Sequence, residues 1–181
     1  MGYFLALDIP DSALSGLNEF SLPQDEAIRK QRREDLHITL AYIGHVPDDK
    51  LEGLEAALAE IEISAFSIQG QGAAYFGPGP GYRNHFFTAE IQLDAALQNL
   101  KEQIDAACLD QGLKPRRHDQ NSFHPHITLA RADIELDQKQ IDKFIKDNKD
   151  KKTPPFQADH FSLYKSQPPK PYLKIRDFPL N

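Results

Sequence analysis

Alternating and helical patterns of hydrophobic residues divide the chain into short strands and amphipathic helices. Residues 3–9 form an apolar run that is typical of a buried strand, whereas Leu51, Leu54 and Leu58 fall on one face of a helix. Strands are predicted over 3–9, 61–75, 84–92, 156–166 and 172–178 and around two central motifs, and helices over 13–20, 48–60, 94–110 and 136–149. Because helices and strands mix without a strict βαβ alternation, the pattern indicates an α+β fold.

A four-residue sequence, His-Ile-Thr-Leu, occurs twice in this pattern, at His37–Leu40 and at His126–Leu129. Each half of the chain carries one copy, within an otherwise apolar strand. The repeat indicates a duplicated unit. We therefore expect residues 1–181 to form a single bilobal domain with one site between two similar lobes.

The period of a strand separates the polar residues of each motif from the apolar ones. His37 and Thr39 should share one face of their strand, because successive side chains point to opposite faces. Ile38, Leu40 and Tyr42 should share the other face, where the aliphatic residues pack into the core. Each motif strand thus presents an imidazole and a hydroxyl about 7 Å apart. A single strand histidine is usually structural, but core packing does not require the same polar pair twice.

Two facing strands of this kind would offer two imidazoles and two hydroxyls across a cleft. Histidine titrates near neutral pH, so one copy can act as a general base and the other as a general acid. The hydroxyls are neutral donors suited to the non-bridging oxygens of a phosphate. The set is typical of a displacement at phosphorus that needs no metal ion.

Metal binding is the rival chemistry for these histidines. His124 and His126 lie two positions apart, and His37 or His160 might complete a site. The proline between the first two and the lack of a nearby carboxylate or cysteine partner weaken this alternative. His124 is then a residue at the start of the strand. The histidines with no repeated context stay unassigned: His45, His85, His118 and His160.

The composition is that of an ordinary globular chain, with 181 residues of which 40% are hydrophobic and 27% charged. The N-terminal stretch lacks a positively charged segment, Asp8 interrupts its apolar run, and no apolar segment approaches the roughly 18 residues of a membrane span. We therefore expect a cytoplasmic protein without a membrane partner, which acts as a monomer.

Charge and cysteine content exclude further classes of protein. A net charge of −6 argues against a protein that coats long nucleic acid by charge alone. The single cysteine, Cys108, excludes a disulfide framework or a cysteine-rich zinc site, and it falls on the buried face of a predicted helix, so we give it no catalytic role. Basic residues precede both motifs: Arg29, Lys30, Arg32 and Arg33 the first, and Lys114, Arg116, Arg117 and His118 the second. Together they would steer an anionic group to one place, although each cluster taken alone is better explained as solvated loop charge.

The paired His-x-Thr-Leu motifs, the second of them within FHPHITLAR at 123–131, resemble those of the 2H phosphoesterase superfamily. Within it they are similar to the RNA 2′,3′-cyclic phosphodiesterases, also called 2′-5′ RNA ligases of the LigT/ThpR type. The similarity covers nearly the whole chain. YFLALDIP is similar to the opening strand of the family, REDLHITLAYIG to its first motif region, and FSLYKSQ with PYLKIRDFPL to its closing strand pair.

This resemblance implies both a fold and a reaction. The fold is a duplicated, bilobal α+β domain in which antiparallel sheets surround a central cleft and helices cover the outer faces. The reaction opens a 2′,3′-cyclic phosphate at an RNA end to a 2′-phosphate, without a metal or other cofactor. Carried over to this chain, His37 and His126 are the catalytic pair, and Thr39 and Thr128 hold the phosphate. His126 would activate water and His37 would protonate the leaving 3′ oxygen, a split that spacing leaves open because the pair is nearly symmetric.

Arg131 matches the arginine that often closes the second motif in this family, where a phosphate contact would suit it. The strand period, however, turns it away from His126 unless the strand ends or bulges there. The chain departs from the family at 75–92, where a long Gly/Pro loop replaces a shorter turn and puts substrate choice in doubt. Four aromatic residues are candidates for stacking on a base, although ordinary packing explains each of them better: Phe76, Tyr82, Phe123 and Tyr164.

Three functions remain open from the sequence. The leading one is an RNA-end cyclic phosphodiesterase, with reverse 2′-5′ joining of RNA as an in vitro activity. The second keeps the site and changes the substrate to a small cyclic nucleotide or an ADP-ribose cyclic phosphate. The third is a non-catalytic RNA-end-binding module, which two residues that titrate near neutrality speak against, because binding alone favours arginine or lysine.

Overall fold

Ten strands, four α-helices and one 3-10 helix make up the part of the chain that the computed structural model describes, residues 2–77, 84–115, 123–134 and 136–181. In chain order they are β1 (Tyr3–Asp8), α1 (Asp11–Asn18), β2 (Arg29–Lys30), η1 (Arg33–Asp35), β3 (His37–Gly44), α2 (Asp48–Ala59), β4 (Phe66–Ile68), β5 (Gly70–Phe76), β6 (His85–Ile91), α3 (Ala95–Asp110), β7 (His126–Ala132), α4 (Gln138–Asn148), β8 (Phe156–Ala158), β9 (His160–Lys165) and β10 (Leu173–Pro179). The predicted α+β class is confirmed, and the predicted helices agree with the observed ones to within two residues at each end.

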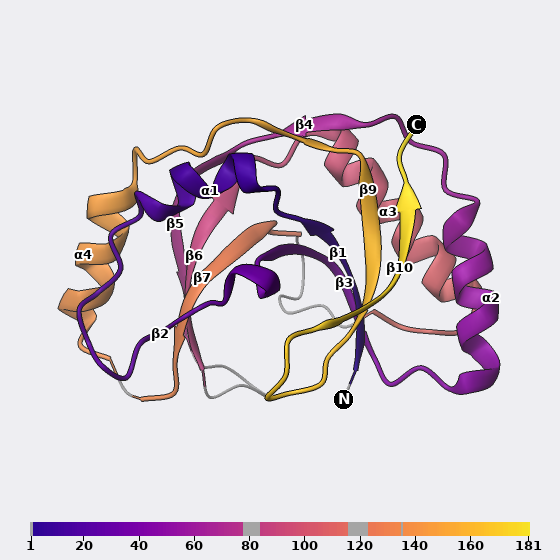
Figure 1. Cartoon of the computed structure of the whole chain (residues 1–181), viewed down its shortest axis with the longest axis horizontal. Helices are drawn as coiled ribbons and strands as arrows, with labels where there is room; N and C mark the ends of the chain where they lie inside the picture. Colours follow the sequence, from indigo (N-terminus) through magenta and orange to yellow (C-terminus); the bar gives the residue numbers. More distant parts are fainter. Residues whose placement is uncertain (1, 78–83, 116–122, 135) are drawn as a thin grey trace.

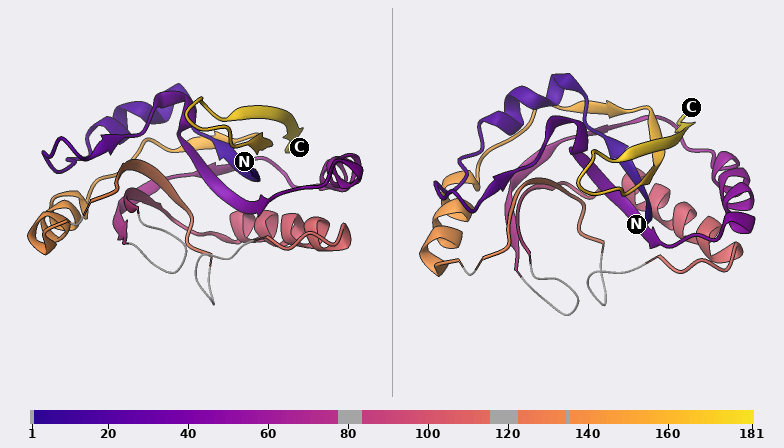
Figure 2. Two further views of the ribbon diagram at one scale, coloured as in Figure 1. Left: turned by 90° about the horizontal axis from the view of Figure 1, so that it is seen from below. Right: turned by 60° about the horizontal axis from the view of Figure 1, so that its bottom comes forward.

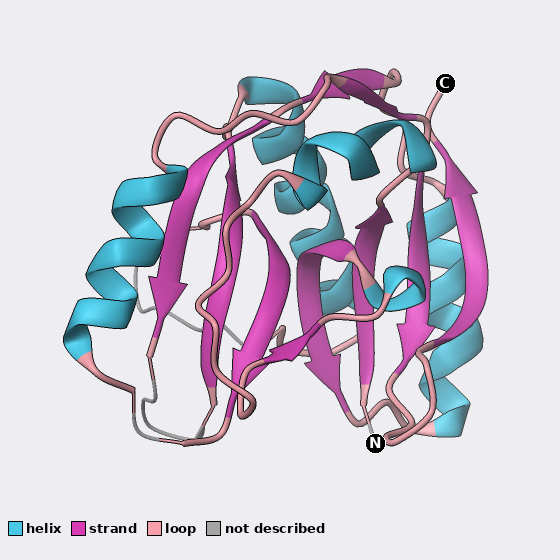
Figure 3. Cartoon of the chain, turned by 60° about the vertical axis from the view of Figure 1, so that its left-hand side comes forward, coloured by secondary structure: helices cyan, strands magenta, loops and turns pink. Residues whose placement is uncertain are grey.

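Eight of the strands form one antiparallel sheet that carries both motifs at its centre (Figure 1). The path of the sheet is β10-β9-β1-β3-β7-β6-β5, and β2 pairs with β7 outside this path. The helices flank it, with α1 and α4 beside β5, β6 and β7 and with α2 and α3 beside the other strands (Figures 1 and 3). No helix of the described residues is long and apolar enough to cross a membrane.

Each half of this sheet takes a strand from the other half of the sequence. β9 pairs with β1, so the C-terminal strands lie against the N-terminal one (Figure 2), and β5 pairs with β6. Outward from β3 the sheet continues through β1 to β9 and β10, which come from the C-terminal end of the chain, and outward from β7 it continues through β6 to β5, which precede β7 in the sequence. The chain crosses between the two halves, which gives the two motifs equivalent surroundings.

Two predicted strands are each divided in two. Residues 61–75 contain β4 and the larger part of β5, separated at Gln69, and residues 156–166 contain β8 and β9, separated at Asp159. β4 and β8 pair with each other in a second, two-stranded sheet. At these breaks the chain passes from one sheet to the other. Local hydrophobic periodicity does not predict such a break. The short elements β2 and η1 were not predicted.

Both motif strands bulge at the leucine of the motif. Leu40 lies between two residues whose partners are consecutive in β1, and Leu129 lies between two residues whose partners are consecutive in β6. The flanking pairs are Leu5 with Ala41 and Ala6 with Thr39 in β3, and Phe87 with Ala130 and Thr88 with Thr128 in β7. A bulge adds one residue to its strand and so reverses the alternation of faces beyond it.

The bulges turn two side chains onto the face of the motif histidines. Tyr42 and Arg131 each lie five positions after a motif histidine, beyond the bulged leucine. The prediction that Tyr42 shares a face with Ile38 is therefore wrong, since Tyr42 is half-buried opposite Phe4 on the histidine face. Arg131 likewise lies on this face, against the strand period that pointed it away.

Candidate active site

The two motifs present their polar side chains on one face of the central sheet. β3 and β7 pair at Ile38 and Ile127, and both isoleucines are fully buried in the core. Continued along the antiparallel strands, this register sets each motif histidine opposite the threonine of the other motif. The four half-buried residues on the opposite face from the isoleucines are His37, Thr39, His126 and Thr128. The arrangement has approximate twofold symmetry.

The first motif histidine is held at both ring nitrogens. His37 Nδ1 lies 2.7 Å from the main-chain oxygen of Asp35, and Nε2 lies 3.0 Å from Thr39 Oγ1. Because a carbonyl oxygen only accepts, the ring carries its proton on Nδ1, and Nε2 is the nitrogen that gains or loses a proton. The ring packs against Phe4 and, nearly perpendicular to it, against Tyr172, with ring centroids 5.1 Å from that of Phe4 and 5.4 Å from that of Tyr172.

Burial lowers the pKa of His37 below its usual 6.5, and the charge of His126 acts in the same direction. The hydrogen bond to the Asp35 carbonyl opposes these effects without cancelling them. His37 Nε2 is therefore unprotonated at neutral pH in the free protein.

The second motif histidine repeats the geometry of the first. His126 Nδ1 lies 2.9 Å from the main-chain oxygen of His124, again two positions earlier. His124 thus occupies the place that Asp35 has in the first motif. The ring of Phe76 lies 4.8 Å from the ring of His126 although its strand, β5, is two strands away, so the sheet curves toward this face.

Asp35, which the sequence analysis did not single out, connects the first motif to the C-terminal hairpin. Its side chain is 4% exposed and accepts hydrogen bonds from Arg32 Nε at 2.6 Å and from the Tyr172 amide at 3.0 Å. Arg32 also donates to the main-chain oxygen of Pro169 at 3.1 Å. The side-chain carboxylate of Asp35 therefore holds the Tyr172 ring against His37, and the main-chain carbonyl of Asp35 holds the imidazole. An acidic residue two positions before the motif histidine was the only signal in the sequence.

Asp8 carries a second polar network beside His37, its cross-strand partner. It accepts hydrogen bonds from Tyr164, from His160 Nε2 at 3.0 Å and from Lys174 Nζ at 2.6 Å. Burial alone would raise the pKa of Asp8, but these bonds outweigh it and lower the pKa. Asp8 thus stays ionised, and its charge favours the protonated form of His37.

The same network contains the group of potential metal ligands that the described residues bring together, Asp8, His160 and Asp177, with ligand atoms within 4.8 Å of one another. The ammonium of Lys174 bonds both carboxylates, at 2.6 and 3.0 Å, and already supplies a cation there. Within the described residues, the rival arrangement of His124 and His126 with a third histidine does not form a three-ligand group.

Arg131 lies on the motif face, directly opposite Arg29 of β2. Burial and the charge of Asp35 raise the pKa of the Tyr172 hydroxyl, and the charge of Arg131 opposes them. Arg131, on the second motif strand, therefore lies near enough to Tyr172, which packs on His37, for its charge to act there.

The remaining candidates have structural surroundings. Tyr164 stacks on Phe4 with ring centroids 5.3 Å apart, and Lys101 lies 5.7 Å above the ring of Phe123. Burial raises the pKa of the Cys108 thiol to about 12, which leaves it un-ionised and unreactive at neutral pH. Four residues lie outside the described part of the chain: Tyr82, Arg116, Arg117 and His118.

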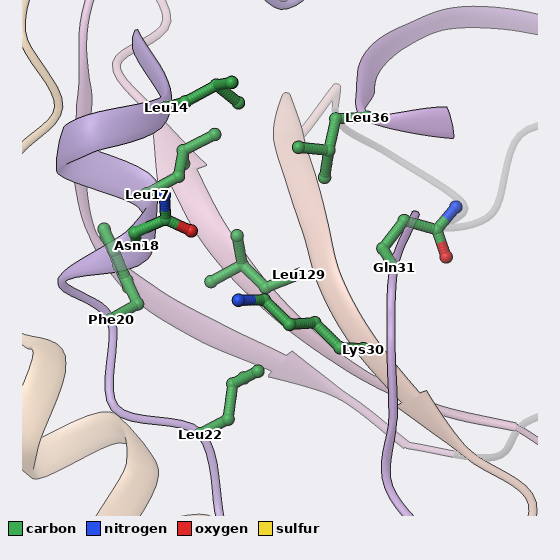
Figure 4. A pocket seen from close by; sticks show the side chains of 9 residues that line it. All are labelled: Leu14, Leu17, Asn18, Phe20, Leu22, Lys30, Gln31, Leu36 and Leu129. Atoms are coloured by element: carbon green, nitrogen blue, oxygen red, sulfur yellow. The ribbon is translucent and has the colours of Figure 1, made fainter. Parts of the chain in front are cut away.

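Two pockets lie near these elements. One, of about 380 Å³, opens beside Asp8 and is also lined by Leu36, His160 and Tyr164. The other is apolar and lies between α1 and the β2–β7 edge, where the bulged Leu129 points toward Leu17 and Leu14 (Figure 4). The motif histidines and threonines line neither pocket. The second pocket belongs to the packing of α1.

Comparison with known proteins places this site in a family. Residues 10–169 match the model of the 2′-5′ RNA ligase superfamily. An RNA 2′,3′-cyclic phosphodiesterase of Methanocaldococcus jannaschii is 29% identical over 170 residues, 92% of this chain and 91% of the relative. Proteins of the same name from Archaeoglobus fulgidus and Geobacillus stearothermophilus are each 32% identical over 134 residues. The match covers 73% of the Archaeoglobus protein and 41% of the Geobacillus protein, so the chain spans less than half of the length of the latter.

Solved structures with low sequence identity share the fold. TT0787 of Thermus thermophilus has a TM-score of 0.76 and 21% identity, with 99% of this chain and 98% of that chain covered. E. coli LigT in its apo form has a TM-score of 0.69 and 20% identity, with 99% and 96% covered. The expected α+β fold is thus shared with these proteins.

Proposed function

The chain belongs to the 2′-5′ RNA ligase superfamily, and we propose that it is an RNA 2′,3′-cyclic phosphodiesterase that opens a terminal cyclic phosphate to a 2′-phosphate. The observation that carries the proposal is the twofold pair of histidines, each with Nδ1 bonded to a main-chain oxygen two positions earlier. This leaves two Nε2 atoms, one on each central strand, as the groups that exchange protons. The names of the curated relatives support the substrate class.

In the proposed reaction a water molecule attacks phosphorus and the bond to the 3′ oxygen breaks. His126 Nε2 takes a proton from the water, and His37 Nε2 gives one to the leaving 3′ oxygen. Thr39 and Thr128 donate hydrogen bonds to the non-bridging oxygens, and Arg131 adds positive charge. The products are a 2′-phosphate and a 3′ hydroxyl. With the 5′ hydroxyl of a second RNA in place of water, the same steps would join two RNA ends: His126 takes the proton of that hydroxyl, the bond from phosphorus to the 3′ oxygen breaks, and a 2′-5′ bond forms.

The lowered pKa of His37 suits its proposed role as the general acid. A buried imidazolium is a stronger acid than one in water and gives up its proton more readily. The anionic phosphate bound against Thr39 would favour the protonated form before the reaction. The groups that this mechanism uses are all side chains of the protein, so we propose that it requires neither metal nor cofactor. Monomeric state and cytoplasmic location belong to the same proposal.

Product analysis tests the proposal. A short RNA that ends in a 2′,3′-cyclic phosphate is incubated with the protein in the presence of a chelator. His37→Ala and His126→Ala should each lower turnover by about 10²- to 10⁴-fold, and His45→Ala, which changes an exposed histidine outside the motifs, should not. The expected product is a 2′-phosphate. Full turnover by either motif variant, or turnover only with added zinc, would contradict the mechanism.

The alternatives give different results in the same experiment. If the protein binds the RNA but forms no product, it is an RNA-end-binding module. If it opens small cyclic nucleotides or an ADP-ribose cyclic phosphate but not the RNA end, the site is catalytic and its substrate class is different.

A further inference from the structure

Two arginines face each other across paired strands beside the second motif. Arg29 of β2 is the cross-strand partner of Arg131 of β7, so their side chains lie on the same face of the sheet. The bulge at Leu129 makes this the face of His126 and Thr128. Like charges directly opposite each other destabilise a sheet. A negative charge between the two arginines would therefore stabilise this pair of strands.

The described residues supply this negative charge only in part. Asp133 Oδ2 lies 2.6 Å from Arg29 Nη2, with 51% and 64% of the two side chains exposed. Among the described residues, no carboxylate forms an ion pair with Arg131. The three side chains therefore carry a net positive charge, on the motif face of a chain whose net charge is −6. An anion from outside the protein would complete the arrangement.

We propose that Arg29 and Arg131 form a second anion subsite, which binds the phosphodiester group next to the cyclic phosphate of an RNA end. This inference rests on the proposed function and narrows its substrate class to an RNA chain end, in place of a cyclic mononucleotide. Thr128 and Arg131 are three positions apart, at most about 10 Å along the strand. Arg131 and Arg29 therefore lie beyond a phosphate held at Thr128, within reach of the next one in the chain. Their planar forks match the oxygens of a phosphate group.

A pair of dinucleotides tests the subsite directly. Both end in a 2′,3′-cyclic phosphate, but one has an ordinary phosphodiester between its nucleosides and the other a neutral methylphosphonate. The two substrates differ by a single charge at the position that the subsite would bind. We expect kcat/KM to be about tenfold higher for the charged dinucleotide, as a charge-assisted hydrogen bond would give.

Variants locate the effect on the protein. Arg29→Gln should lower the ratio of kcat/KM for the charged over the neutral dinucleotide toward one, and Asp133→Asn, which releases Arg29, should raise it. Arg176→Gln is the matched control, because it removes another exposed ion pair, with Glu55 at 3.2 Å, and should leave the ratio unchanged. Arg29→Gln should also reduce the slope of log Kd against log salt concentration by about 0.7 for the charged dinucleotide.

The outcomes separate this inference from the proposed function. Equal kcat/KM values for the two dinucleotides with the wild-type protein would overturn the subsite, and an unchanged ratio in Arg29→Gln would remove Arg29 from it. The Kd values of both dinucleotides are measured alongside. If neither is hydrolysed but the charged one still binds more tightly, and Arg29→Gln abolishes that difference, the subsite stands and the proposed reaction fails.

Discussion

His37 Nδ1 lies 2.7 Å from the main-chain oxygen of Asp35, a residue whose carboxylate is buried on the other side of the same short turn. Arg32 and the Tyr172 amide both donate hydrogen bonds to that carboxylate. These bonds hold Asp35 in place and so fix the direction of its main-chain carbonyl. The orientation of the imidazole that we propose to exchange protons thus depends on an ion pair that does not itself contact the ring. Asp35 is a positioning residue in this arrangement.

Asp35→Asn should lower kcat about 10- to 100-fold with little change in KM, because a small displacement of His37 is costly to the reaction. The variant keeps the size of the side chain and removes the ion pair with Arg32. The charge and the carbonyl of Asp35 both raise the pKa of His37. We therefore expect the limb of the pH profile that belongs to His37 to move to lower pH, which a purely structural defect would not cause.

Asp11→Asn is the control for this effect, since Asp11 forms an exposed ion pair with Arg33 near the same turn. It should leave both kcat and the pH profile as in the wild type. Equal losses in the two variants would show that Asp35 has no specific role in positioning His37.

The roles of the two histidines are separated by a change of leaving group. A nucleoside 2′-phosphodiester with a p-nitrophenolate leaving group needs no general acid, because that group leaves as an anion. His37→Ala should therefore retain at least about tenfold more of the wild-type activity on this substrate than on the cyclic phosphate, while His126→Ala loses activity on both. If His126→Ala is the variant that recovers, the acid and the base are exchanged.

The sequence was sufficient to predict the polar face of the site up to the end of each motif. Alternation places His37 and Thr39 on one face and buries Ile38, as the structure has it. The predicted alternation of faces failed beyond Leu40, because the bulge at this residue depends on how β1 pairs with β3 and has no local signature in the sequence. The face of Tyr42 follows from this long-range pairing.

The residues that support the site were missed for a related reason. The network around Asp8 draws on β9 and β10, which lie more than 150 positions away in the sequence, as the separation of 152 between Asp8 and His160 shows. Only the exchange of strands between the two halves brings them together. Asp35 stands next to the motif, but its partner Tyr172 comes from the same distant hairpin. A duplicated motif reveals the centre of such a site and not the segments that surround it.

Burial of His37 makes the stability of the protein depend on pH. Its pKa in the folded protein lies below the 6.5 of the unfolded chain, so between these values the unfolded chain binds the extra proton. The contribution to stability is present above pH 6.5 and is lost as the pH falls through the folded value. We expect the fall in Tm between pH 7.5 and pH 5 to be smaller in His37→Asn than in the wild type. His45→Asn, at an exposed position, should melt like the wild type at both pH values.

His160 should show the opposite dependence on pH. Burial alone would lower its pKa, but the bonds to Asp159 and to Asp8 outweigh it and raise the pKa above 6.5. The folded protein then holds a proton that the unfolded chain has lost, so the stabilisation is complete below pH 6.5 and disappears as the pH rises through the folded value. His160→Gln should therefore lower Tm more at pH 5.5 than at pH 9. Asp8→Asn should reduce this difference, because it removes one of the two carboxylates that bond the imidazole. A loss of Tm in His160→Gln that is the same at both pH values would mean that the imidazole contributes by packing alone and that its charge plays no part in the Asp8 network.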